Sequence, residues 1–194
     1  MPKMDQSLVF KDVEKCLGAG GCIAMFPEGG SHDNSDLLPF KAGIAMMTLG
    51  TIVKTGQVPI IIPSGLKYFK RHEFRSRCVL EFGRPYKPTK KIVELYKSGD
   101  KRKAIALMLK DLEARMREVT MTAPSINELH AIYMARNLYL PKNLDSFTPE
   151  QENEIYQRFN KGYYQVKDKP ETQQLVEAIT SYRQMLKLLN IEDE

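Results

Sequence analysis

The feature that most constrains the fold of this chain is a polar, glycine-rich turn directly after a short apolar run. Residues 22–25 (CIAM) are apolar, as in a buried strand. Residues 26–33 (FPEGGSHD) then bring together a proline, two carboxylates, two glycines, a hydroxyl and an imidazole. Glycine lets a backbone approach a ligand and point its N–H groups at an anion, and α/β proteins bind ligands where a strand ends. The pattern therefore predicts a ligand-binding loop in an α/β fold.

The hydrophobic periodicity of the whole chain predicts a small sheet followed by helices. Strands are expected at residues 21–26, 58–62 and 76–82. Helices are expected at residues 7–17, 40–55, 104–119, 125–140 and 173–189, with another that begins at Thr148-Pro149. Because a right-handed crossover connects them, the first two strands would be parallel. The expected fold class is α/β, a partial sheet with helices packed on it, followed by a mostly helical C-terminal region.

Several segments resemble the glycerolipid acyltransferase superfamily, which moves an acyl chain from a thioester to a glycerol-phosphate hydroxyl. Residues 26–31 (FPEGGS) look like its third signature block. The longer string 26–39 (FPEGGSHDNSDLLP) is closer to the fungal-type glycerol-3-phosphate/dihydroxyacetone-phosphate acyltransferases. Residues 58–65 resemble the fourth block, and residues 119–124 and 135–139 also resemble that subfamily. Matches in order over most of a chain are more specific than one short motif.

The resemblance implies a part of a longer, membrane-bound enzyme of phospholipid biosynthesis. Residues 1–100 would be the C-terminal part of its acyltransferase α/β domain, and residues 101–194 a helical extension packed on it. The implied reaction moves an acyl chain from acyl-CoA, as co-substrate, to the sn-1 hydroxyl of glycerol-3-phosphate or dihydroxyacetone phosphate, with no metal or other cofactor. The parent protein would lie at the cytoplasmic face of the endoplasmic reticulum membrane. These 194 residues contain no apolar run of the roughly 20 residues that spans a bilayer.

The resemblance also assigns roles to the turn. The family uses the glutamate at the position of Glu28 to hold the glycerol part of the acceptor, and we expect this carboxylate to face a cleft at the carboxyl edge of the sheet. Gly29, Gly30 and Ser31 would offer N–H groups and a hydroxyl to the phosphate. Because many relatives have an arginine where this chain has Ser31, we expect Lys41 to supply the cation. The candidate substrate-binding residues are Phe26, Pro27, Glu28, Gly29, Gly30, Ser31, His32, Lys41, Pro63 and Gly65.

Each of these roles has a simpler alternative. Glu28 is then a solvated loop carboxylate or a helix cap, the two glycines form a plain tight turn, and Lys41 is an exposed surface lysine. His32 and Asp33 have the chemistry of a base and its orienting carboxylate. Adjacent residues rarely face each other, so we expect a structural or secondary binding role for His32.

The reactive histidine–aspartate pair of the family is not found in this sequence. The family places that histidine five positions before an aspartate, upstream of the FPEGG block. Five positions after His32, His72 and His130 stand Leu37, Arg77 and Ala135. We therefore name no catalytic residue, and we expect this chain to be the C-terminal part of an acyltransferase domain without activity of its own.

Charge keeps two other functions open. The formal net charge of +5 favours anionic partners such as phospholipid headgroups or phosphorylated substrates. A basic cluster with interleaved aromatic residues spans residues 67–77 (KYFKRHEFRSR), which suits a membrane-surface patch or a solvated loop better than stacking on RNA bases. The alternatives are a non-catalytic remnant that binds phospholipid or a partner protein, and a basic nucleic-acid-binding domain; we expect a membrane surface and no nucleic acid as partner.

Overall fold

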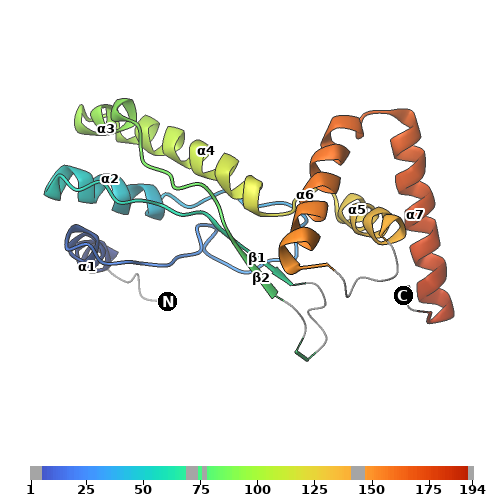
Figure 1. Cartoon of the computed structure of the whole chain (residues 1–194). Coiled ribbons are helices and arrows are strands. Elements are labelled where there is room, and N and C mark those ends of the chain that lie inside the picture. The colour runs from blue at the N-terminus through green and yellow to red at the C-terminus, as the bar shows by residue number, and fades with distance from the viewer. Residues whose placement is uncertain (1–5, 69–73, 76–77, 141–146, 192–194) are drawn as a thin grey trace. The chain divides into compact units, whose positions relative to one another are not determined.

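The computed structural model describes residues 6–68, 74–75, 78–140 and 147–191, and it divides into two compact units (Figure 1). Unit 1 comprises residues 1–32 and 38–120, and unit 2 comprises residues 33–37 and 121–194. The α/β class with a helical C-terminal region is confirmed. The predicted division after residue 100, between an acyltransferase domain and its extension, stays a prediction.

Unit 1 contains helices with clear local start and stop signals. They are α1 (Gln6–Gly18), α2 (Gly43–Thr55), α3 (Lys90–Lys97) and α4 (Lys101–Val119). The side chain of Thr89 accepts the N–H of Ile92 at the start of α3, and a side-chain oxygen at an N-cap satisfies an N–H group that has no partner within the helix. Gly56 ends α2 in the left-handed conformation, with a φ of 75°.

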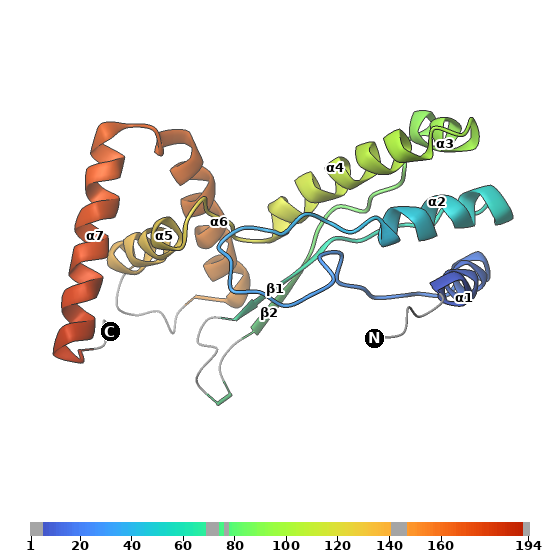
Figure 2. The same ribbon diagram turned by 180° about the vertical axis from the view of Figure 1, so that it is seen from behind.

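The core of unit 1 lies among α2, α3 and α4. Figures 1 and 2 show α2 between α1 and α4, with α3 against the beginning of α4. Leu49 of α2 and Met108 of α4 are both completely buried. The buried residues of this core are Ala45, Leu49, Ile52, Tyr86, Ile92, Ala104, Met108 and Leu112. The predicted apolar stripe of residues 104–119 is therefore confirmed as core.

The sheet of unit 1 is a single antiparallel pair. Strand β1 (Ser64–Tyr68) pairs with β2 (Cys78–Phe82), with Leu66 opposite Leu80. One face of this pair lies so close to the end of α4 that a Cβ atom at Gly65 would be 2.8 Å from the carbonyl carbon of Val119. The opposite face leaves Leu66, Leu80 and Phe82 exposed. The predicted strand at residues 76–82 is confirmed over 78–82, and residues 76–77 lie outside the described residues.

The other two predicted strands are wrong. Residues 21–26 form no strand, and residues 58–62 pair only at Ile61, which forms an isolated antiparallel bridge with Tyr86. A strand needs a neighbour to take up its backbone N–H and C=O groups. Among the described residues no strand pairs with 21–26, and Phe26 is 89% exposed. The predicted parallel pairing of these two segments is wrong for the same reason.

Unit 2 is helical in its described residues. It contains α5 (Ile126–Tyr139), α6 (Pro149–Val166) and α7 (Pro170–Leu189), and Figure 2 shows α5 between the other two. The predicted start of a helix at Thr148-Pro149 is confirmed, because Thr148 forms a reciprocal capping box with Gln151. Ser125 caps α5 in the same position by accepting the N–H of Glu128. Ala131 and Met134 of α5 pack with Ile179 of α7.

A polar cluster is buried between α5 and α6. The guanidinium carbon of Arg136 lies 3.8 Å from the centroid of the Tyr156 ring, and both Arg136 and Glu152 are only 6% exposed. Nη1 of Arg136 donates to Oδ1 of Asn137 at 2.8 Å, whereas its buried Nε has no partner among the described residues. Burial lowers the pKa of Arg136 and raises the pKa of Tyr156 to about 12. Arginine stays charged under ordinary conditions, so this cluster places a cation inside unit 2.

We expect the free energy of unfolding of unit 2 to fall between pH 9 and pH 11. The pKa of Tyr156 is about 12 in the folded chain, against 10.0 for a free tyrosine, so its contribution is complete below pH 10 and is lost as pH rises towards 12. These two values correspond to a loss of about 1 kcal/mol over that interval. Urea titrations followed by amide NMR signals of α5 and α6 measure it. Tyr156→Phe should lose about 1 kcal/mol less over this interval than Tyr139→Phe, which replaces an exposed tyrosine of α5. Burial and the hydrogen bond to Glu128 also raise the pKa of Tyr163, so its contribution remains in both variants. Equal pH dependence in the two variants would contradict the assignment.

Candidate functional site

The Pro-Glu-Gly-Gly segment forms a tight turn in unit 1. The N–H of Gly29 donates to the carbonyl of Phe26 at 3.1 Å, which closes the turn through Pro27 and Glu28. Gly29 has a φ of 69°, in the left-handed region that favours glycine. The N–H of Lys41 donates to the carbonyl of Pro27 at 2.8 Å. The chain therefore comes back to the turn at Lys41, two residues before α2 begins.

The carboxylate of Glu28 is fixed by two contacts of the same oxygen. Oε2 accepts the backbone N–H of Leu38 at 2.7 Å and lies 2.5 Å from Nε2 of His32. The side chains of Glu28 and His32 are only 19% and 20% exposed. No contact to the second oxygen, Oε1, is recorded among the described residues. The side chain of Glu28 is thus fixed through Oε2, and Oε1 remains available for a ligand. Glu28 is therefore not a solvated loop carboxylate that extends into bulk solvent.

Lys41 lies against the glycines of the turn. A Cβ atom at Gly29 would be 2.8 Å from Cδ and 3.0 Å from Nζ of Lys41, so the lysine side chain occupies the space that a side chain at position 29 would need. No carboxylate in the described part of the chain forms an ion pair with this ammonium group. A Cβ atom at Gly30 would have no neighbour within 4 Å, so the backbone there is open. A carboxylate, an ammonium group and open backbone therefore meet in one turn.

The other candidate residues are placed differently. Ser31 is exposed beside the turn, whereas Pro63 and Gly65 are buried at the start of β1. The carbonyl of Pro63 accepts the N–H of Gly83 at 2.8 Å, and Gly65 packs against Val119. These contacts give Pro63 and Gly65 a structural role in the packing of β1. Their role in substrate binding stays a prediction. No strand leads into the turn, so the turn does not lie at the end of a sheet strand as expected. The expectation that Glu28 faces a cleft stays a prediction.

Sequence reasoning missed the backbone N–H of Leu38 as a partner of Glu28. No residue type signals this contact, since any residue except proline offers the same N–H group. His32, four residues after Glu28, contacts its carboxylate, so the two side chains hold one part of the loop together. The predicted site is therefore a turn that is fixed by hydrogen bonds, and its role in substrate binding stays a prediction.

The basic cluster of residues 67–77 is described only in part. Nζ of Lys67 binds Oε2 of Glu81 on the neighbouring strand at 2.6 Å, and the guanidinium of Arg75 lies 5.5 Å from the centroid of the Phe74 ring. Residues 69–73 and 76–77 lie outside the described residues. Lys67 is therefore engaged within the sheet, and the membrane, loop and RNA alternatives for the rest of the cluster stay predictions.

Within the described residues, no three histidine, cysteine, aspartate or glutamate side chains are grouped to hold a metal ion. None of the described helices is both long and apolar enough to cross a membrane.

Family models match both ends of the chain. The model described as "Acyltransferase" matches residues 3–66, which include the Glu28 turn and α2. The model described as "Glycerol-3-phosphate acyltransferase 2 C-terminal domain" matches residues 131–194, all of which belong to unit 2.

Curated relatives match almost the whole chain. An uncharacterized acyltransferase of Schizosaccharomyces pombe is 37% identical over 193 residues, which is 99% of this chain and 28% of the relative. Glycerol-3-phosphate O-acyltransferase 2 of Saccharomyces cerevisiae is 37% identical over 98% of this chain and 26% of the relative. Glycerol-3-phosphate O-acyltransferase 1 of the same yeast is 36% identical over 98% of this chain and 25% of the relative. The chain thus spans about a quarter of the length of these relatives. No solved structure matches it.

Proposed function

We propose that this chain, which is similar to fungal glycerol-3-phosphate O-acyltransferases, is part of a longer acyltransferase and that its Glu28 turn holds the acceptor. The reaction is acyl transfer from acyl-CoA to the sn-1 hydroxyl of glycerol-3-phosphate or dihydroxyacetone phosphate in phospholipid biosynthesis. The parent enzyme works at the cytoplasmic face of the endoplasmic reticulum membrane, where its acyl substrate and its product partition. The observation that carries the proposal is the meeting of Glu28, Gly29 and Lys41 in one turn.

The phosphate and the hydroxyl groups of the acceptor need binding groups of opposite charge, and the turn contains a cation and a carboxylate. The phosphate is an anion, which the ammonium of Lys41 and the N–H groups around Gly30 can bind. The hydroxyl groups are donors, which the remaining oxygen of Glu28 can accept. Because His32 and the N–H of Leu38 already hold the other oxygen, the carboxylate is oriented before the acceptor arrives.

We expect chemistry on the bound acceptor to need the reactive histidine–aspartate pair of the family. In acyl transfer the hydroxyl oxygen attacks the thioester carbonyl, its proton moves to a base, and the thiol of coenzyme A leaves. The family's histidine–aspartate pair is absent from residues 1–194. We therefore expect this chain to bind the acceptor without turning it over.

Binding and turnover are measured separately on the purified 194-residue chain. Glycerol-3-phosphate should shift the amide NMR signals of residues 28–31, 38 and 41, and Lys41→Gln and Glu28→Gln should each weaken its binding about tenfold, since a hydrogen bond to a charged group is lost. Lys97→Gln, at an exposed lysine in the last turn of α3, is the control for loss of one positive charge.

The outcomes separate the competing functions. Formation of acylated product from labelled acyl-CoA would show that the chain is active by itself. No shift at the turn, or equal weakening by Lys97→Gln, would contradict the acceptor site. Binding to phospholipid vesicles without binding of glycerol-3-phosphate would favour a non-catalytic remnant, and RNA affinity that falls steeply with salt would favour a nucleic-acid binder.

A further inference from the structure

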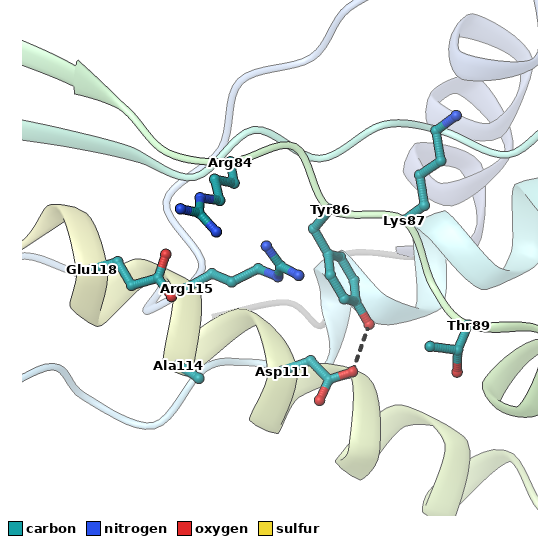
Figure 3. Close-up of a pocket in the computed structure, with 8 residues that line it drawn as sticks. All are labelled: Arg84, Tyr86, Lys87, Thr89, Asp111, Ala114, Arg115 and Glu118. Carbon is teal, nitrogen blue, oxygen red and sulfur yellow. Dashed lines mark hydrogen bonds between the residues drawn. The ribbon is translucent and has the colours of Figure 1, made fainter.

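A polar pocket lies in unit 1, between the segment that precedes α3 and the C-terminal half of α4 (Figure 3). Its volume is about 440 Å³, enough for a small anion or a headgroup. The residues that line it are Arg84, Tyr86, Lys87, Thr89, Asp111, Ala114, Arg115 and Glu118. None of these residues belongs to the Glu28 turn.

Tyr86 forms the rigid base of this pocket. It is only 3% exposed, and its hydroxyl donates to Oδ2 of Asp111 at 3.1 Å. Burial and the adjacent carboxylate raise the pKa of Tyr86 above that of a free tyrosine, so the hydroxyl keeps its proton and the carboxylate of Asp111 stays engaged with it. The guanidinium carbon of Arg115 lies 5.2 Å from the centroid of the Tyr86 ring, which fixes the direction of that side chain.

Two guanidinium groups share this pocket without a carboxylate partner. In Figure 3 Arg115 extends from α4 toward the Tyr86 ring and Arg84 points from its own segment toward α4, so both guanidinium groups lie on the same side of Tyr86, while the ammonium of Lys87 points away. Within the described part of the chain, neither guanidinium forms an ion pair, and the neighbouring Arg117 by contrast binds Glu113 at 2.9 Å. Like charges side by side repel each other, and an anion between them removes that repulsion.

We propose that Arg84 and Arg115 bind a phosphate group, carried either by a soluble phosphorylated ligand or by the headgroup of an anionic lipid. Guanidinium groups offer paired N–H donors that match two oxygens of a phosphate. Arg115 is already oriented by Tyr86, so little freedom is lost when the anion binds. The exposed carboxylate of Glu118 lies on the lining of the same pocket and opposes the anion, which limits the affinity.

The test uses the full chain and inorganic phosphate as the first probe. Phosphate should give saturable shifts in the amide signals of residues 84–87 and 111–118. Arg84→Gln and Arg115→Gln should each weaken this binding about tenfold, whereas Glu118→Gln should leave it as tight or make it tighter. Arg117→Gln removes the same charge from the same helix outside the pocket, and it should leave the dissociation constant unchanged. Because Arg84 is exposed and stacks on no ring, Arg84→Gln keeps the test valid even where Arg115→Gln fails to fold.

The source of the phosphate is then resolved with two further probes. Saturable binding of glycerol-3-phosphate at residues 84–87 and 111–118 indicates a soluble ligand, and sedimentation with vesicles of phosphatidic acid but not phosphatidylcholine indicates a lipid headgroup. Either kind of binding should be about tenfold weaker in Arg84→Gln. The proposal would be overturned if phosphate and glycerol-3-phosphate gave no saturable shifts and the chain did not sediment with phosphatidic acid vesicles, or if Arg117→Gln weakened binding equally. The positions of the shifted amides also distinguish this pocket from the Glu28 turn. A negative result at residues 84–87 and 111–118 would therefore not contradict the proposal for the Glu28 turn.

Discussion

Gly65→Ala is expected to lower the free energy of unfolding of unit 1 by about 3 kcal/mol or more. A loss of this size would unfold unit 1 if its stability is low. A Cβ atom at this position would overlap the backbone of Val119, 2.8 Å from its carbonyl carbon and 3.2 Å from its Cβ. Val119 is the last residue of α4 and is 2% exposed, so it has no room to move. The clash is with backbone, which a side-chain rotation cannot relieve.

Gly43→Ala is the matched control. Gly43 begins α2, and a Cβ atom there would have no neighbour within 4 Å. Alanine is a better helix former than glycine, so this change should be neutral or stabilising by up to about 1 kcal/mol. Urea unfolding followed by circular dichroism and by amide signals of α2 and α4 measures both variants. A wild-type midpoint for Gly65→Ala would mean that β1 does not lie against the end of α4.

Arg136→Met is expected to destabilise unit 2 by about 3–5 kcal/mol, because removal of one member of a buried charged cluster leaves the other uncompensated. Glu152 is as deeply buried as Arg136 and attracts it electrostatically. The methylene groups of methionine replace most of the arginine stem, so loss of packing contributes little. The measurement is urea unfolding monitored on α5 and α6.

A double-mutant cycle separates charge from packing. Arg136→Met with Glu152→Gln should recover part of the loss, giving a coupling free energy of at least about 1 kcal/mol. Arg158→Met is the control, because Arg158 pairs with Glu154 on the exposed surface of α6, and such pairs contribute about 0–1 kcal/mol. Strict additivity of the two buried substitutions would show that Arg136 and Glu152 act independently.

Most helices of this protein were predictable because their signals are local, although α3 (Lys90–Lys97) was not expected as a separate helix. Ser125 and Thr148 are both helix caps in the structure, as their spacing to Glu128 and Gln151 predicts. A capping hydrogen bond joins residues three positions apart, so the sequence contains both partners side by side. The tight turn at Gly29 is predictable on the same ground, since its proline and glycine suit adjacent positions of one turn.

The strands were less predictable because a strand depends on a distant neighbour. Residues 58–62 have the β-branched composition of a buried strand, yet β1 begins only at Ser64. The apolar composition of a segment does not determine which other segment it pairs with, or which face of the resulting strand is buried. In β2 the covered side carries Val79 and Glu81, whereas Cys78, Leu80 and Phe82 are exposed.

The two candidate sites also differ in how much of each can be predicted from local sequence and how much depends on tertiary packing. The sequence alone determined that Glu28, Gly29 and Gly30 form a polar turn, because the turn is closed by bonds between neighbours. Only the tertiary structure decided that Leu38 and His32 share one oxygen of Glu28, that Lys41 lies against Gly29, and that Arg84 and Arg115 line the same pocket beside Tyr86. The physical reason is range: caps and turns are made within a few residues, whereas strand pairing, burial and the meeting of charges depend on how helices pack far along the chain.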